Sequence, residues 1–425
     1  MSSTAIVANA PSLADTRASI SKYFPMGSIM GSGKNSPISL HSVHPLLFAA
    51  VWSLIGETLV AQGFLARPVC EKIAKQVSMS NRCPICVTAH AMMEAAATKA
   101  AKDERDRRRR EQRQRKKNGG SVEESSNASS GNATGSGSTT NASKDDEDSI
   151  REALEAEAIE YSKIIHKATQ VSMIVVEDEN GSDNSPTDSV AASAPSSLDD
   201  RAKAEVAIVV FLFEHMNRVV SVIMGETMST AMFGVPEKIA APMESPSFMA
   251  KMNNWIMGPF LKGYFRKDRT PKSGFTSKLF DAEGANQEYV LPTHLRGAKD
   301  AGPGRSQAVA RWTAVVDAME KEEPISTLLG DNGLSQIATI RKDLKKACLR
   351  SRTATAHLAE CVKDVEDEKQ RAALLVILLT TCVPGLANKS LEWKEAKKVL
   401  GDETARLLVV WWSMKLSVEQ AKGLE

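Results

Sequence analysis

The most informative stretch of the chain runs from Ser80 to Glu94 and reads SNRCPICVTAHAMME. Proline is favoured at the first position of a helix, so Pro84 predicts a helix that begins immediately after Cys83. Cys86 then lies in the first turn, where free backbone amides and the positive end of the helix dipole favour a thiolate. Helical spacing places Cys83, Cys86 and His90 on one face of this helix.

Two carboxylates are placed to assist this dithiol. Glu94 lies one turn beyond His90 on the same face, where it can orient the imidazole. Glu71 belongs to the preceding helix, and antiparallel packing through a turn at residues 78–81 brings its carboxylate towards the thiols. A thiolate in this setting attacks a hydroperoxide, becomes a sulfenic acid and is resolved to a disulfide by the second cysteine. His90 or Glu71 supplies the proton that the leaving oxygen needs.

The spacing of these residues resembles a known family. A glutamate twelve residues before a C-x-x-C motif, with a histidine four residues after the second cysteine, is similar to the AhpD-like branch of the carboxymuconolactone decarboxylase superfamily. The resemblance implies an all-α, commonly oligomeric protein that reduces hydroperoxides through the motif. It also implies that Cys86 is the peroxidatic cysteine and that Cys83 is the resolving and more exposed partner.

Two further features bear on this resemblance. Ile85 stands where the peroxidase of the family often has a histidine, which removes one member of the proton relay. The segment FLFEHMNRVV, from Phe211 to Val220, resembles a later helix of related chains, in which an aromatic residue or histidine precedes Asn-Arg near the dithiol. His215, Asn217 and Arg218 are therefore secondary candidates for the site.

The rest of the chain predicts an all-α fold, in which helices alternate with polar segments. Apolar periodicity and capping signals predict helices over 45–61, 67–77, from 83 or 84 onward, 150–170, 201–224, 307–321, 334–348, 353–365, 368–382, 391–399 and 402–416. We interpret the charged run from Lys102 to Lys117 as a solvated extension rather than a nuclear address or a nucleic-acid patch.

The domain organisation follows from these segments. We expect a loose N-terminal arm over 1–40, an AhpD-like helical domain over 41–235, an irregular connection over 236–305 and a C-terminal helical block over 306–425. Disordered insertions over about 102–149 and 176–199 interrupt the helical domain, because they bury too little apolar surface to fold. Similar tryptophan spacings at Val51 and Arg311 make a degenerate repeat one interpretation of the C-terminal block.

Composition excludes several classes of protein. The chain has 425 residues and a formal net charge of +2, which argues against nucleic acid as a partner. The most apolar segment, 204–225, carries too many charged residues to span a bilayer. Six scattered cysteines do not form a disulfide scaffold. We expect an intracellular, cytoplasmic protein, with an organellar transit peptide in the first thirty residues as the alternative.

We predict a homo-oligomeric, thiol-dependent peroxidase that uses no metal, haem or flavin and is reduced by an external thiol. A thiol–disulfide oxidoreductase or electron-transfer adaptor with the same dithiol is the first alternative. A redox-sensing interaction protein and a lactone decarboxylase of the same superfamily follow it. For the cysteines alone, half of a zinc site is the alternative, since Cys83, Cys86 and His90 supply three of the four ligands needed.

Overall fold

The computed structural model describes residues 11–24, 36–117, 144–173, 198–224, 270–280, 303–344 and 353–422. Within these ranges the chain forms α-helices and short 3-10 or π-helical turns, and it forms no strand. The predicted all-α class is therefore confirmed.

The helices of the first half of the chain are α2 (Leu13–Tyr23), η2 (Ser39–Val43), α3 (Pro45–Ile55), the π-helical turn η3 (Gly56–Val60), α4 (Arg67–Ser80), α5 (Pro84–Lys117), α6 (Lys144–Met173) and α8 (Asp200–Ile223). The helices of the second half are η6 (Phe275–Leu279), α13 (Pro303–Met319), α14 (Ile325–Leu329), α15 (Gly333–Asp343), α17 (Ala354–Cys361), α18 (Glu368–Cys382), α19 (Pro384–Ala387), α20 (Leu391–Leu400) and α21 (Asp402–Lys422). Helix α18 has its predicted bounds. The other predicted helices have counterparts that differ at their ends, and the short helices α14 and α19 were not predicted.

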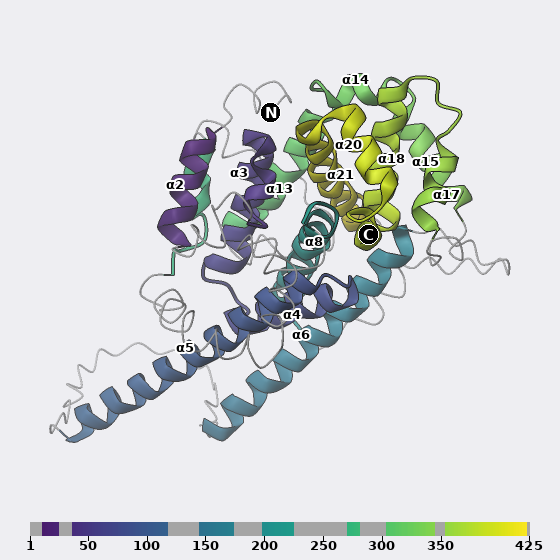
Figure 1. The fold of residues 1–425 in the computed structure, drawn as a ribbon. Coiled ribbons are helices and arrows are strands. Elements are labelled where there is room, and N and C mark those ends of the chain that lie inside the picture. The colour runs from purple at the N-terminus through teal and green to yellow at the C-terminus, as the bar shows by residue number, and fades with distance from the viewer. Residues whose placement is uncertain are drawn as a thin grey trace, which may run out of the picture.

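Helix α8 lies in the middle of the fold, in contact with α4, α6, α19 and α21 (Figure 1). Its N-terminus is capped by Asp199, whose side chain accepts a hydrogen bond from the amide of Ala202. Every residue from Ala204 to Val222 is buried, as expected of a helix that is apolar on most of its circumference. Among the described residues it is the one helix long and apolar enough to cross a membrane, a property that buried core helices share.

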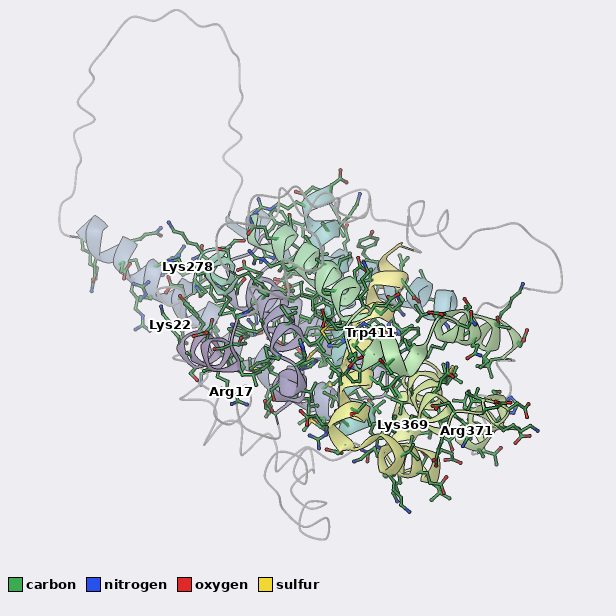
Figure 2. The ribbon with its side chains drawn as sticks, turned by 90° about the horizontal axis from the view of Figure 1, so that it is seen from above. Arg17, Lys22, Lys278, Lys369, Arg371 and Trp411 are labelled. Atoms are coloured by element: carbon green, nitrogen blue, oxygen red, sulfur yellow. The ribbon has the colours of Figure 1, made fainter. Side chains whose placement is uncertain are left out.

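The C-terminal helices share one core with the N-terminal helices. Helix α13 packs on α3, and α21 packs on α8, within a single cluster of buried apolar side chains. Trp312 of α13 is fully buried, lies with its ring 5.4 Å from that of Phe211, and donates a hydrogen bond to the Met414 carbonyl at 3.3 Å. Figure 2 shows Trp411 in the middle of the molecule and Lys369 at its edge.

The prediction of a loose arm over residues 1–40 is wrong for the segment that forms α2. Ser12 caps this helix by accepting from the amide of Asp15, and Ile20 is fully buried. The indole nitrogen of Trp52 donates to the Ser19 hydroxyl at 3.0 Å, which ties α2 to α3. A short helix with a cap and one buried face is thus held by packing that the sequence alone does not reveal.

The prediction of disorder over 102–149 is wrong at both ends. Helix α5 continues to Lys117 and α6 begins at Lys144. Arg, Glu and Gln are strong helix formers, and Arg107 forms ion pairs with Glu104 and Glu111 at helical spacing, with N···O distances of 2.9 and 2.7 Å. The predicted disorder over residues 118–143 and 176–197 lies outside the described residues.

The predicted irregular connection over 236–305 is described only in part. Residues 270–280 are ordered around η6, and α13 begins at Pro303, four residues earlier than predicted. The remainder of this connection, including Trp255, lies outside the described residues.

We expect Trp312→Ala to lower the free energy of unfolding by roughly 3–5 kcal/mol, because it empties a buried volume shared by both halves of the chain. Urea unfolding followed by circular dichroism and by fluorescence should give one common transition. Leu391→Ala is the control: this side chain is 64% exposed, so the change should cost less than about 0.5 kcal/mol. A separate transition of the C-terminal helices would contradict a shared core.

Candidate active site: a buried dithiol between α4, α5 and α8

The turn between α4 and α5 sets the positions of the two cysteines. Arg82 has a φ of 53°, a left-handed conformation that reverses the chain direction. The amide of Cys83 donates to the Ser78 carbonyl at 3.0 Å, and Pro84 begins α5 as predicted. Cys83 therefore caps the helix, and Cys86 lies in its first turn.

The two thiols are adjacent and buried. Their side chains are hydrogen-bonded to each other, and no disulfide joins them. The exposed fraction is 0% for Cys83 and 5% for Cys86, so the prediction that Cys83 is the more exposed thiol is wrong. The physical reason is that α8 covers the turn, with the Ser221 hydroxyl hydrogen-bonded to Cys83.

The surroundings separate the acidities of the two thiols. Burial acts to raise the pKa of Cys83, but hydrogen bonds from the Cys86 thiol, from the amides of Cys86 and Ile85, and from Ser221 outweigh burial and lower this pKa. Burial raises the pKa of Cys86 well above its usual value, and the hydrogen bond to Cys83 and the negative charge of Cys83 raise it further. Cys83 is thus favoured as the thiolate, and Cys86 as the thiol that donates to it.

Glu71 and His90 meet across the α4–α5 interface, whereas the sequence predicts a Glu71 carboxylate directed towards the thiols. The Glu71 carboxylate is fully buried, accepts from Arg67 Nε at 2.6 Å and is hydrogen-bonded to His90 Nδ1 at 2.7 Å. Burial acts to raise the pKa of Glu71, but the charge of Arg67 and the hydrogen bond with His90 outweigh it and lower the pKa. The edge of the His90 ring meets Phe213, with centroids 4.3 Å apart, which fixes the imidazole from the side of α8.

The prediction that Glu94 orients His90 is not fulfilled, because the Glu94 carboxylate pairs with Lys75 at 2.5 Å. Glu71 orients the imidazole instead. Among the residues that the structure describes, no hydrogen bond joins His90 to either thiol, so the imidazole stands one helical turn below Cys86 without touching it.

Helix α8 brings one secondary candidate, Asn217, to the dithiol turn, and a second, Arg218, lies beside it on the same helix. Asn217 Oδ1 accepts a hydrogen bond from Ser78 Oγ at 3.0 Å. Arg218 donates to Glu214 at 2.9 Å, and both side chains are buried. The helical spacing of 214, 217, 218 and 221 places all four on one polar stripe, which ends at Ser221 beside Cys83.

The third candidate, His215, faces away from this stripe. Its Nε2 lies 2.8 Å from His41 Nε2, and its ring meets Trp312 edge-on at 4.8 Å. His41 Nδ1 lies 3.0 Å from the Ile38 carbonyl, so that nitrogen carries the proton and His41 Nε2 accepts from His215. The pair is fully buried and belongs to the core rather than to the dithiol.

The site includes residues that the sequence analysis missed. Arg67, Glu214 and Ser221 contribute buried polar contacts, and His166 of α6 is hydrogen-bonded to Glu214 through Nδ1. The recurrence of polar residues at 214, 217, 218 and 221 within an otherwise apolar segment is a signal that was available. His166 carries no such signal, because its partner lies on another helix.

A cleft of about 1130 Å³ lies beside α4 and α5, and neither cysteine of the dithiol lines it. Its lining includes Arg67, whose guanidinium holds Glu71 from that side, and Glu155 of α6. Among the described residues, no three His, Cys, Asp or Glu side chains are placed to hold a metal ion. Comparisons with protein-family models, curated proteins and solved structures found no match, so the geometry of this chain carries the functional argument.

The buried His41–His215 pair predicts a loss of stability in mild acid. Burial lowers the pKa of His41 to about 4 and, with the charges of His41 and Arg218, lowers that of His215 well below its usual value. The unfolded chain therefore takes up protons near pH 6.5 that the folded chain refuses until about pH 4, so stability falls as the pH drops through this window. His41 alone accounts for roughly 3 kcal/mol across it.

We expect the free energy of unfolding, measured in urea at pH 7 and pH 5, to show this loss. His41→Gln should flatten the pH dependence, because a neutral amide cannot take up the proton in either state. His357→Gln, at an exposed histidine of α17, should leave the pH dependence as it is in the wild-type protein. Equal slopes for His41→Gln and wild type would contradict the assignment.

Proposed function

We propose that this protein is a thiol-dependent peroxidase of the AhpD-like type, in which Cys83 is the attacking thiolate. The observation that carries this proposal is the pair of thiols at the start of α5. Hydrogen bonds lower the pKa of Cys83, while its neighbour Cys86 has a raised pKa and keeps its proton. This assignment reverses the roles that the family resemblance implies.

The first step is the attack of the Cys83 thiolate on the terminal oxygen of a hydroperoxide. A sulfur–oxygen bond forms, the oxygen–oxygen bond breaks, and the sulfur is oxidised to a sulfenic acid. The leaving alkoxide or hydroxide takes the proton of the Cys86 thiol, which already points at Cys83 through their hydrogen bond. This transfer releases an alcohol or water and converts Cys86 to the thiolate that the next step needs.

The second step closes the disulfide. The Cys86 thiolate attacks the sulfur of the Cys83 sulfenic acid and expels hydroxide, which needs one proton to leave as water. His90 is the closest proton carrier by helical spacing, and the ionised Glu71 carboxylate holds its Nδ1 by a hydrogen bond. An external thiol then reduces the disulfide and returns two protons and two electrons to the pair.

Burial favours small oxidants. With exposed fractions of 0% and 5%, the two sulfurs are covered by protein, so hydrogen peroxide reaches them with less rearrangement than a bulky hydroperoxide or a protein disulfide. The same burial argues against a general oxidoreductase of protein disulfides, because exchange with a protein disulfide needs a more exposed sulfur than exchange with a small external thiol.

One equivalent of hydrogen peroxide should convert the reduced protein to a form with a Cys83–Cys86 disulfide, detected by mass spectrometry of peptides. In Cys86→Ser the reaction should stop at a sulfenic acid on Cys83, trapped with dimedone. In Cys83→Ser the dimedone adduct on Cys86 should form more slowly than the adduct on Cys83 does in Cys86→Ser, because burial keeps the Cys86 thiol protonated.

Cys382→Ser is the matched control. Burial raises the pKa of Cys382 to about 12, so its thiol stays protonated at neutral pH, and its loss should leave peroxide consumption unchanged. Sulfenic acid trapped on Cys86 alone would keep the peroxidase proposal but restore the roles implied by the family. Unchanged peroxide consumption after replacement of both Cys83 and Cys86 would refute the proposal.

The order of rates with different oxidants is a second prediction. Hydrogen peroxide should oxidise the dithiol about tenfold or more faster than cumene hydroperoxide, which corresponds to about 1.4 kcal/mol in the barrier. Insulin disulfide should be reduced more slowly still. Stopped-flow tryptophan fluorescence for the peroxides and a turbidity assay for insulin measure these rates. Faster reduction of insulin than of either peroxide would favour the oxidoreductase alternative.

A further inference from the structure

A second carboxylate–imidazole pair lies on the other side of the dithiol turn. His166 Nδ1 of α6 is hydrogen-bonded to the Glu214 carboxylate of α8, and Arg218 holds the second carboxylate oxygen at 2.9 Å. The pair repeats the chemistry of His90, Glu71 and Arg67: a buried glutamate shared between an arginine one turn away on its own helix and a histidine on a neighbouring helix. The side chain of His166 is 13% exposed and that of Glu214 is 1% exposed, so the imidazole connects solvent with a buried charge.

This second pair is joined to Cys83 by two routes. The Asn81 side chain is hydrogen-bonded to Glu214, and Asn81 is two residues from Cys83 in the turn that positions it. On α8, Arg218 lies one turn from Ser221, whose hydroxyl is hydrogen-bonded to Cys83. The cluster therefore faces the cysteine that caps α5, whereas Glu71 and His90 lie one turn below Cys86.

We propose that His166 and Glu214 are positioning residues for Cys83, and that protonation of His166 adds a positive charge that stabilises the Cys83 thiolate. This inference rests on the proposed role of the dithiol. The two pairs then have different roles. The His90–Glu71 pair delivers the proton that leaves with hydroxide, and the His166–Glu214 pair changes the pH at which the Cys83 thiolate forms.

The charges in the cluster determine whether protonation of His166 stabilises or destabilises the Cys83 thiolate. Burial acts to raise the pKa of Glu214, but Arg218, His166 and Asn81 outweigh it and lower the pKa, so the carboxylate stays ionised. The opposite charges of Glu214 and Arg218 offset each other, and a proton on His166 leaves the cluster with a net positive charge. A positive charge near a thiolate stabilises it, and the low dielectric constant of the interior strengthens this attraction.

The helices packed against α6 present few other charges. Helix α8 contributes Glu214 and Arg218 to the cluster. Arg341 of α15 repels Arg218 and forms an ion pair with Glu419 of α21. Lys72 of α4 forms an ion pair with Glu155, which is also on α6. Of these described groups, His166 is the one histidine, the side-chain type that serves most often as a pH-dependent charge.

The experiment measures the thiolate of Cys83 through its absorbance at about 240 nm, in a background that carries Cys86→Ser, Cys348→Ser and Cys361→Ser so that these other thiols do not contribute. Cys70 and Cys382 do not interfere, since burial raises the pKa of each thiol to about 12. His166→Gln should raise the pH midpoint of thiolate formation by roughly one unit. His166→Lys, which keeps a positive charge, should restore the midpoint, and His357→Gln should leave it unchanged.

A second measurement keeps His166 in place and follows its own titration, so it does not depend on the folding of the His166 variants. Because coupling between two sites is reciprocal, His166 should keep its proton to a higher pH when Cys83 is a thiolate than in Cys83→Ser. NMR titration of the His166 ring in these two proteins measures the difference. Equal titrations of the ring, or an unchanged thiolate midpoint in folded His166→Gln, would overturn the inference.

The outcomes also separate this inference from the proposed function. A shifted thiolate midpoint without peroxide consumption would refute the peroxidase proposal and leave the coupling intact. Normal peroxide consumption by the wild-type protein with no shift in His166→Gln would refute the coupling alone.

Discussion

The structure depends on the charges that α8 carries into the core. Glu214 and Arg218 lie in the buried part of a mostly apolar helix, and an unpaired ion in such a place costs several kcal/mol. The Glu214 carboxylate is also hydrogen-bonded from outside the helix, by His166 and by the turn that follows α4, and these contacts offset part of the cost of burial. Asn217 reaches the same turn through Ser78. These contacts fix the turn relative to α8. They therefore also fix the position of the two cysteines, which belong to the turn and to the first turn of α5.

The difference between the two sulfurs follows from where α5 begins. Pro84 fixes the first helical residue, so Cys83 occupies the cap and receives the amides that have no partner within the helix. Cys86 lies one turn further along, where its own backbone is already engaged and its thiol meets the charge of Cys83. Two adjacent buried thiols do not both ionise, because like charges repel in a low dielectric medium. The helix start at Pro84 thus combines with the hydrogen bonds from Cys86 and Ser221 to favour the charge on Cys83.

Features that depend on local spacing were predictable from the sequence, and features that depend on packing were not. The antiparallel packing of two helices joined by a short turn was predicted, and it brings Glu71 to the dithiol helix, although its partner there is His90 rather than a thiol. The burial of Cys83 was not, because it depends on Ser221, which lies far along the chain on α8. The prediction for His215 failed for a related reason. Sequence proximity to Asn217 suggested a shared site, but a rotation of about 200° for two residues along a helix points the two side chains in nearly opposite directions.

The C-terminal helices explain why the dithiol requires more of the chain than the helices that form it. Among the described residues they donate no hydrogen bond to either sulfur, yet they fix the reverse side of α8. Ser413 donates to the His215 carbonyl at 3.2 Å, and Trp312 meets the His215 ring at an interplanar angle of 89°. Without α13 and α21 this apolar side of α8 would face water, and α8 would lose the packing that opposes its contact with the α4–α5 turn. The acidity of Cys83 therefore depends on side chains on both sides of one helix, although only one side touches the sulfur.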